Sequence, residues 1–162
     1  MSTGRTTLWG VGALVVAVVL VVALRPRPPV DARTQVEALT ADVAKAVEHE
    51  WVPRIIGKLA DDYSDDMGNS RTSLKANLRE AMLGPREWHV EWQTVSVDEP
   101  DRDTVRARLN MDATELENGS PLATYRGRLD VTFRRVGREL RAVRVDGLKS
   151  IADKVEARYN GD

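Results

Sequence analysis

Cysteine is absent from the 162-residue sequence, phenylalanine occurs once and histidine twice. Without cysteine the chain forms no disulfide, no thiolate zinc site, no cysteine nucleophile and no acylated-cysteine lipoprotein anchor. An excess of charge of one sign is also lacking, because 24 Lys and Arg residues face 25 Asp and Glu residues. A net charge of −1 provides no long-range attraction to nucleic acid or acidic lipid, so we expect no nucleic-acid partner.

One long apolar run is present, at 8–24, with no charged residue inside it. At about 1.5 Å per residue a helix of this length spans roughly 25 Å, the short end of what a bilayer requires. We predict a short tail at 1–7 and a single-pass transmembrane helix at 8–24. A cleaved signal peptide is the alternative, because Val21-Val22-Ala23 offers small or medium residues at a cleavage position. The flanking charges nearly balance, so the short tail decides for an extracytoplasmic C-terminal domain.

Residues 25–31 contain three prolines within four positions, which exclude a helix and predict a short stiff linker. The length of the remaining chain fits one domain, which we expect at 32–148, followed by a tail at 149–162 that could form a short helix. From Asp31 onward the chain has 21 basic and 25 acidic residues. This domain is therefore mildly acidic and is not attracted to an anionic membrane surface.

Apolar residues between 31 and 83 recur every three or four positions, which predicts three helices. The first covers about 31–51, the second is short and keeps Leu59 on its buried side, and the third begins after an Asn69-Ser70 cap. After Pro85 the apolar residues alternate instead, which predicts strands with one buried face. The four alternating runs are 88–92, 105–113, 125–134 and 139–145. Helices followed by hairpin-connected strands indicate an α+β fold, with about three helices packed on a curled antiparallel sheet of about four strands.

The sequences of the two middle strands also predict the register in which these strands pair. A two-residue Asn118-Gly119 turn would pair Leu109 with Arg128 and set the apolar faces on opposite sides of the sheet. A three-residue loop that includes Ser120 pairs Leu109 with Leu129 instead. The same register sets Arg108 opposite Asp130 and Asp112 opposite Arg126, so we expect these arginines to be matched by acidic residues.

The order of three helices and then four strands is accompanied by two short sequences, Leu59-Ala60-Asp61-Asp62-Tyr63-Ser64-Asp65 before the third helix and Gly137-Arg138-Glu139-Leu140 on the last strand. Together they resemble the nuclear transport factor 2-like superfamily, the cystatin-like roll that is also seen in ketosteroid isomerases and polyketide cyclases. The resemblance covers about 32–148 and is to bacterial members of unknown function. It implies a cone-shaped roll whose mouth binds small apolar ligands, and it suggests a bacterial inner membrane for the anchor.

The densest group of chemically active side chains is Asp61, Asp62, Asp65 and Asp66. Their spacing is not the alternating acidic pattern of a calcium loop, so we predict no metal and expect capping or pairing roles. His49 and His89 are expected at the surface. The sequence contains no Gly-rich phosphate loop, serine elbow or His-x-x-x-His pair, so we assign no catalytic residue and no cofactor.

If a ligand binds, the residues predicted to line its pocket are Asp62, Tyr63, Trp88, Trp92 and Tyr125. The leading hypothesis is a membrane-anchored, non-enzymatic interaction or accessory domain with a protein partner or a second copy of itself. The alternatives are a binding module for a small apolar ligand, and an isomerase- or cyclase-like enzyme with Asp62 as base and Tyr63 as hydrogen-bond donor.

Overall fold

The computed structural model describes residues 30–83 and 87–159, so the transmembrane segment predicted at 8–24, the tail at 1–7 and most of the linker lie outside the described residues. The contacts within the chain group Asp31–Asp162 into one compact unit. Within the described ranges, no helix has the length and apolar character needed to cross a membrane.

Four helices are described, and the sequence signals at their starts explain where they begin. Helix α2, Ala32–Glu48, begins after Asp31, whose carboxylate accepts the backbone N–H of Thr34 at 3.2 Å. Helix α3, Val52–Ile56, has a proline in its first turn. Helix α4, Arg71–Met82, is capped by Ser70 as predicted, and α5, Leu148–Tyr159, forms the helix that the C-terminal tail could form.

The sheet has five strands in the order β1-β5-β4-β3-β2. They are β1 Leu59–Asp65, β2 Glu87–Asp98, β3 Thr104–Glu117, β4 Ser120–Val136 and β5 Glu139–Asp146. The α+β class is confirmed, but the prediction of four antiparallel strands is wrong, because β1 adds a fifth strand that runs parallel to β5. Leu59 begins this strand rather than completing the second helix. The partner for β1 lies about eighty residues away, and a local pattern carries no signal for such pairing.

The predicted register between β3 and β4 is confirmed, whereas the loop that was expected to produce it is wrong. Leu109 pairs with Leu129, yet Asn118 and Gly119 form a two-residue turn with φ of +52° and +76°. The register shifts between the turn and the rest of the hairpin, where Leu122 is an extra residue in β4. This β-bulge restores the apolar faces to the same side of the sheet.

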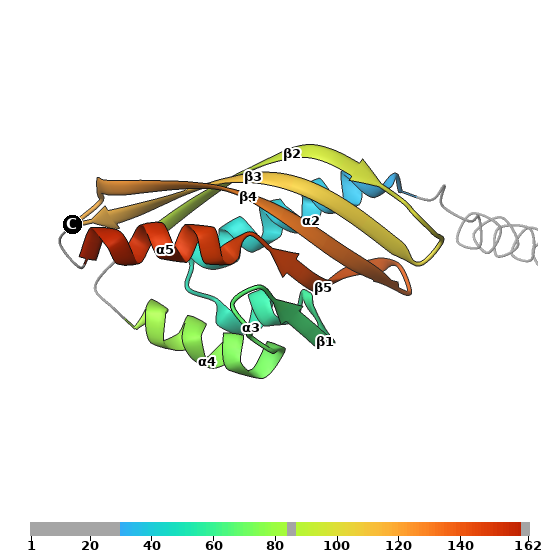
Figure 1. Cartoon of the computed structure of the whole chain (residues 1–162), viewed down its shortest axis with the longest axis horizontal. Coiled ribbons are helices and arrows are strands. Elements are labelled where there is room, and N and C mark those ends of the chain that lie inside the picture. Colours follow the sequence, from blue (N-terminus) through green and yellow to red (C-terminus); the bar gives the residue numbers. More distant parts are fainter. Residues whose placement is uncertain (1–29, 84–86, 160–162) are drawn as a thin grey trace, which may run out of the picture. The chain divides into compact units, whose positions relative to one another are not determined.

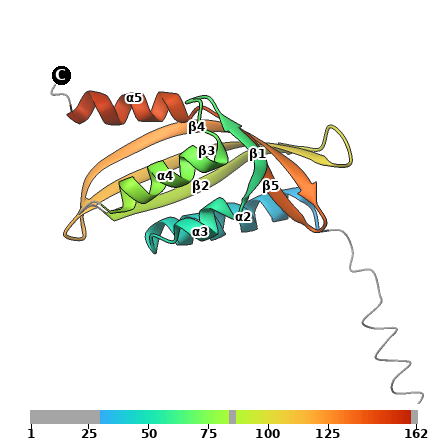
Figure 2. The same ribbon diagram turned by 90° about the horizontal axis from the view of Figure 1, so that it is seen from below.

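The four described helices lie on one face of the curled sheet (Figure 1), and the view from below shows the same arrangement (Figure 2). Inward-facing residues of the strands pack there against α2 and α5, forming a core whose most buried apolar members are Val36, Val105 and Phe133. The outer face is polar, with Arg108 bonded to Asp130. Alternate positions of each strand therefore divide the sheet into an apolar inner face and a charged outer face.

Helix α5 packs against the half of β4 that has no strand partner on its β5 side, because β5 pairs with β4 only from Asp130 onward. Ile151 occupies the space over Gly127, where a side chain would clash with it. Lys154 Nζ donates to the carbonyl of Arg126 at 2.7 Å, and Arg158 donates to that of Leu122 at 3.0 Å. The helix therefore covers an otherwise open sheet edge.

Candidate functional site: an apolar cavity in the roll

A cavity of about 240 Å³ lies between the inner face of the sheet, helices α2, α3 and α4, and the first residue of α5. Its wall is almost wholly apolar. The strands contribute Leu59, Leu109, Leu129, Val131, Phe133, Ala142 and Val145, and the helices contribute Leu39, Val43, Ile55, Leu74, Leu78 and Leu148. Four described residues bring polar atoms to this wall, namely Thr40, Lys58, Tyr63 and Trp92, and their partners decide what the cavity can do.

Tyr63 lies at the cavity with 4% of its surface exposed. Its hydroxyl donates to Asp65 Oδ2 at 3.2 Å. Burial raises the pKa of Tyr63, and the negative charge of Asp65 raises it further. Asp65 also accepts the backbone N–H groups of Met67 and Asn69 and the side-chain amide of Asn69, at 2.8 to 3.1 Å. Tyr63 is therefore a protonated phenol whose hydroxyl is already hydrogen-bonded to Asp65, and the Asp65 carboxylate in turn holds the loop after β1.

Asp62 faces away from the cavity. Consecutive strand residues point to opposite faces, so Asp62 and Tyr63 do not meet in one pocket. Arg134 donates both terminal nitrogens to the Asp62 carboxylate, at 3.1 and 2.8 Å, on the solvent-exposed side of the sheet. These hydrogen bonds lower the pKa of Asp62. The pairing of Asp62 as base with Tyr63 as donor is not assembled in this structure.

The other two members of the aspartate group are also engaged. Asp61 forms an ion pair with Arg71 at the start of α4. Asp66 accepts the backbone N–H of Gly147 at 2.8 Å and that of Lys149 at 3.3 Å, which joins the loop after β1 to the start of α5. The described residues contain no group of three His, Asp or Glu side chains suited to a metal ion.

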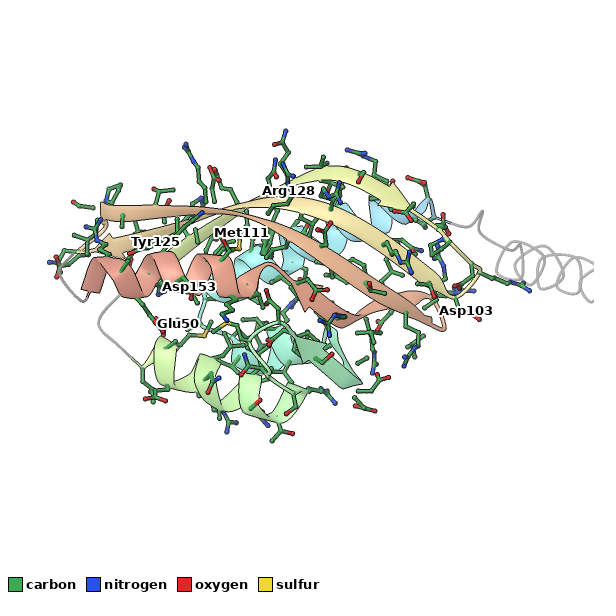
Figure 3. The ribbon with its side chains drawn as sticks, in the orientation of Figure 1. Glu50, Asp103, Met111, Tyr125, Arg128 and Asp153 are labelled. Atoms are coloured by element: carbon green, nitrogen blue, oxygen red, sulfur yellow. The ribbon has the colours of Figure 1, made fainter. Side chains whose placement is uncertain are left out.

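The aromatic candidates separate into two places. Trp92 lies at the cavity, and its indole nitrogen is buried without a hydrogen-bond partner. Trp88 and Tyr125 contact each other instead, with ring centroids 6.0 Å apart, and the Tyr125 hydroxyl donates to the fully buried Glu115 at 3.4 Å. Figure 3 shows Tyr125 and Met111 between the sheet and α5. Among the described candidates, Tyr63 and Trp92 thus line the cavity, whereas Trp88 and Tyr125 pack elsewhere on the inner face.

Lys58 is the cavity residue that the sequence pattern did not single out. Its ammonium group lies 2.9 Å from Asp42 Oδ2, while the residue forms part of the cavity wall. Nothing in the periodicity marks it, because Lys58 sits between the end of α3 and the start of β1. Both histidines behave as expected, with His89 exposed beside Glu48 at 2.6 Å and His49 at the end of α2.

No protein-family model matches the sequence, and a search of curated proteins finds no match. Solved structures do resemble it. Aln2 from a Streptomyces species is 16% identical, with 83% of this chain and 98% of Aln2 aligned at a TM-score of 0.66. A protein from Catenulispora acidiphila, solved in complex with S-DNPA, is 12% identical over 75% of this chain and 96% of its own, at 0.62. A ketosteroid isomerase-like protein from Erwinia carotovora atroseptica is 12% identical over 70% and 92%, at 0.57.

These likenesses establish the fold. The domain has the fold of these structures, a cystatin-like α+β roll, and this is the fold that the resemblance of its sequence implied. At 12–16% identity the comparison carries the fold and leaves the function to be argued from this chain's own side chains.

Proposed function

We propose that this protein is a membrane-tethered, non-catalytic binding module that holds a small apolar ligand in the cavity of its roll. The observation that carries the proposal is an apolar cavity whose wall includes one buried donor without a partner, the indole N–H of Trp92. Buried donors in proteins are nearly always hydrogen-bonded, so a ligand with an acceptor oxygen would complete this one. The cavity volume of about 240 Å³ lies below the range of roughly 300–1,000 Å³ that is usual for pockets of drug-sized ligands. A cavity of this size favours a ligand with one or two rings.

Binding is favoured over turnover because the groups suited to acid–base chemistry are already engaged. Tyr63 donates to Asp65, whose oxygens accept three further hydrogen bonds. Asp62 is held outside by Arg134. A proton-transfer mechanism would require one of these carboxylates to leave its partners and enter the cavity. The neighbour that was solved in complex with S-DNPA supports ligand binding by a roll of this kind.

The tether is the second part of the proposal, and its support comes from the sequence. The apolar run at 8–24 and the proline-rich linker favour a single-pass anchor with the domain outside the cytoplasm. In bacterial cells we expect the full chain to stay in the membrane pellet after carbonate washing, and protease added to spheroplasts to cleave it. A chain recovered in the carbonate supernatant, or one that is protected until the membrane is lysed, would contradict this part of the proposal.

The cavity is tested with the full chain in lipid nanodiscs, using two matched probes of similar size. 2-Acetonaphthone has a carbonyl acceptor, and 2-ethylnaphthalene has none. The sequence contains four tryptophans, so the nitrogen-15 spectrum has four indole signals, and Trp92→Phe assigns one of them. We expect the Trp92 N–H signal to shift downfield with the ketone and less with the hydrocarbon, because only the ketone accepts its hydrogen bond.

Two variants control for binding elsewhere. Ala142 contributes to the cavity wall, so Ala142→Leu reduces the space for the probe and should abolish the shift. Ala81 is exposed on α4, so Ala81→Leu adds the same atoms outside the cavity and should leave the shift unchanged. If neither probe moves the Trp92 signal, or if both variants behave alike, the cavity is not a binding site and the proposal fails.

A further inference from the structure

The apolar cavity borders two polar surface pockets, and it shares different residues with each. Leu39 and Lys58 also line an outer pocket of about 370 Å³, formed by α2, α3 and the beginning of β5. Thr40 and Trp92 also line a larger groove of about 790 Å³ between α2 and β2. A ligand in the cavity therefore has two polar boundaries, one at Lys58 and one at Trp92.

Lys58 spans the first boundary. Its ammonium group pairs with Asp42, which lines the outer pocket and is not among the residues of the cavity wall. The charged end of Lys58 thus lies in the outer pocket, while its carbon chain faces the apolar cavity, an arrangement that long cationic side chains commonly adopt. A ligand whose apolar body fills the cavity would place its end next to this ammonium group.

The two polar pockets differ in charge. The charged residues of the outer pocket are Arg54, Lys58, Arg138, Asp42 and Glu139, an excess of one positive charge. The charged residues of the groove are Arg33, Glu37, Glu91 and Asp112, an excess of two negative charges. An anionic group is therefore favoured at the Lys58 boundary and disfavoured at the Trp92 boundary.

Among the three cations of the outer pocket, Arg138 is the one without an ion pair to a described residue. Arg54 and Lys58 both pair with Asp42, and their hydrogen bonds lower the pKa of Asp42 to about 2, so Asp42 stays ionised at neutral pH. Arg138 follows Gly137 in the turn between β4 and β5 and forms no ion pair or hydrogen bond with any described residue. Its guanidinium is thus available to a carboxylate in the outer pocket.

We propose that the ligand is an amphiphilic monocarboxylic acid, with its apolar body in the cavity, an acceptor oxygen toward Trp92 and its carboxylate in the outer pocket beside Lys58 and Arg138. This inference rests on the proposed function and adds the chemical class of the ligand. One carboxylate matches the single excess positive charge of the outer pocket. Because Lys58 and Trp92 connect the cavity to different polar pockets, the acceptor and the carboxylate are expected at different ends of the molecule.

The test extends the ketone probe by one group. 6-Acetyl-2-naphthoate adds a carboxylate at the end opposite the acetyl group, and the corresponding carboxamide adds a neutral group of nearly the same size. Titrations of the full chain in nanodiscs follow the Trp92 indole signal, with empty nanodiscs as the blank for partitioning. We expect the carboxylate to bind about fivefold more tightly than the carboxamide, the preference that partly exposed ion pairs supply.

Arg138→Gln should reduce that preference to about twofold or less without changing the affinity for the carboxamide. Arg128→Gln is the matched control. Arg128 is an exposed arginine on the outer face of β4, away from the cavity (Figure 3). Like Arg138, it has no partner among the described residues. If the carboxamide binds as tightly as the carboxylate, or if both variants lower the preference equally, the inference is overturned while the proposed function stands. If no probe binds, the proposed function itself has failed.

Discussion

Helix α5 packs closely against the sheet at Gly127, and one added methyl group there measures how strongly the domain depends on that contact. A Cβ at residue 127 would lie 2.3 Å from Ile151 Cγ1 and 2.4 Å from Cδ1, whereas ordinary contact begins near 3.4 Å. The helix must therefore retreat by about 1 Å, or Ile151 must adopt a strained rotamer. Such overpacking costs about 1–3 kcal/mol, and alanine recovers about 0.5 kcal/mol because glycine is unfavourable in a strand. We expect Gly127→Ala to lower the free energy of unfolding by about 1.5 kcal/mol, the middle of the range that these two terms leave.

Urea unfolding of the full chain in nanodiscs, followed by tryptophan fluorescence, measures this difference. Ile151 is 7% exposed, so Ile151→Ala alone should cost about 2–4 kcal/mol through the cavity that it creates. In the double variant the methyl group of residue 127 occupies part of that cavity. We therefore expect the double variant to lose at least about 1 kcal/mol less stability than the sum of the two single-variant losses. Unchanged stability of Gly127→Ala, or strict additivity of the pair, would show that α5 does not rest on this glycine.

Three further outcomes are expected. Asp42→Asn should lower the free energy of unfolding by about 1 kcal/mol at pH 7, because the ion pairs lie near the surface. Since the folded pKa of Asp42 is lowered to about 2 from 3.8, the difference between variant and parent should be full above about pH 4 and vanish as the pH falls through 2, as urea titrations across that range will show. Asp66→Ala should cost about 1 kcal/mol and speed amide exchange at Gly147 and Lys149, and unchanged exchange would argue against the capping contact. Deleting Leu122 should remove the bulge and keep the hairpin folded with Leu109 opposite Leu129, because the two-residue turn then leads into the same pairs without an extra residue, and loss of the strand signal in circular dichroism would contradict this.

The strands β2 to β5 could be predicted because one face of each is buried, so apolar and polar residues alternate along them. Even the register between β3 and β4 followed, since Leu109 opposite Leu129 and Arg108 opposite Asp130 satisfy both faces at once. The predicted loop length was wrong because the bulge depends on the packing of the whole sheet and not on the local sequence. The Asn118-Gly119 sequence favours a two-residue turn and the strand faces require another register, and one extra residue in β4 reconciles the two.

Strand β1 could not be predicted, because its sequence carries three aspartates in seven residues and its burial follows no simple alternation. Its structure depends on parallel pairing with β5 and on partners that local sequence does not reveal, such as Arg134 for Asp62. The candidate site shares this limit. Aromatic character pointed to Tyr63 and Trp92, but composition alone could not separate them from Trp88 and Tyr125, and it gave no reason to choose Lys58.

The position of α5 over the open half of β4 has a consequence for biosynthesis. Domains form from the N-terminus as the chain is made, at about 5–20 residues per second, and the covering helix comes after every strand of the sheet. The edge that Lys154 and Arg158 later occupy is therefore open to pairing with other nascent chains for roughly two to six seconds after the middle of β4 has been synthesised. A ribosome that stalls or terminates before residue 148 would release a nearly complete sheet with this edge exposed, and aggregation is the first defect that we expect from it.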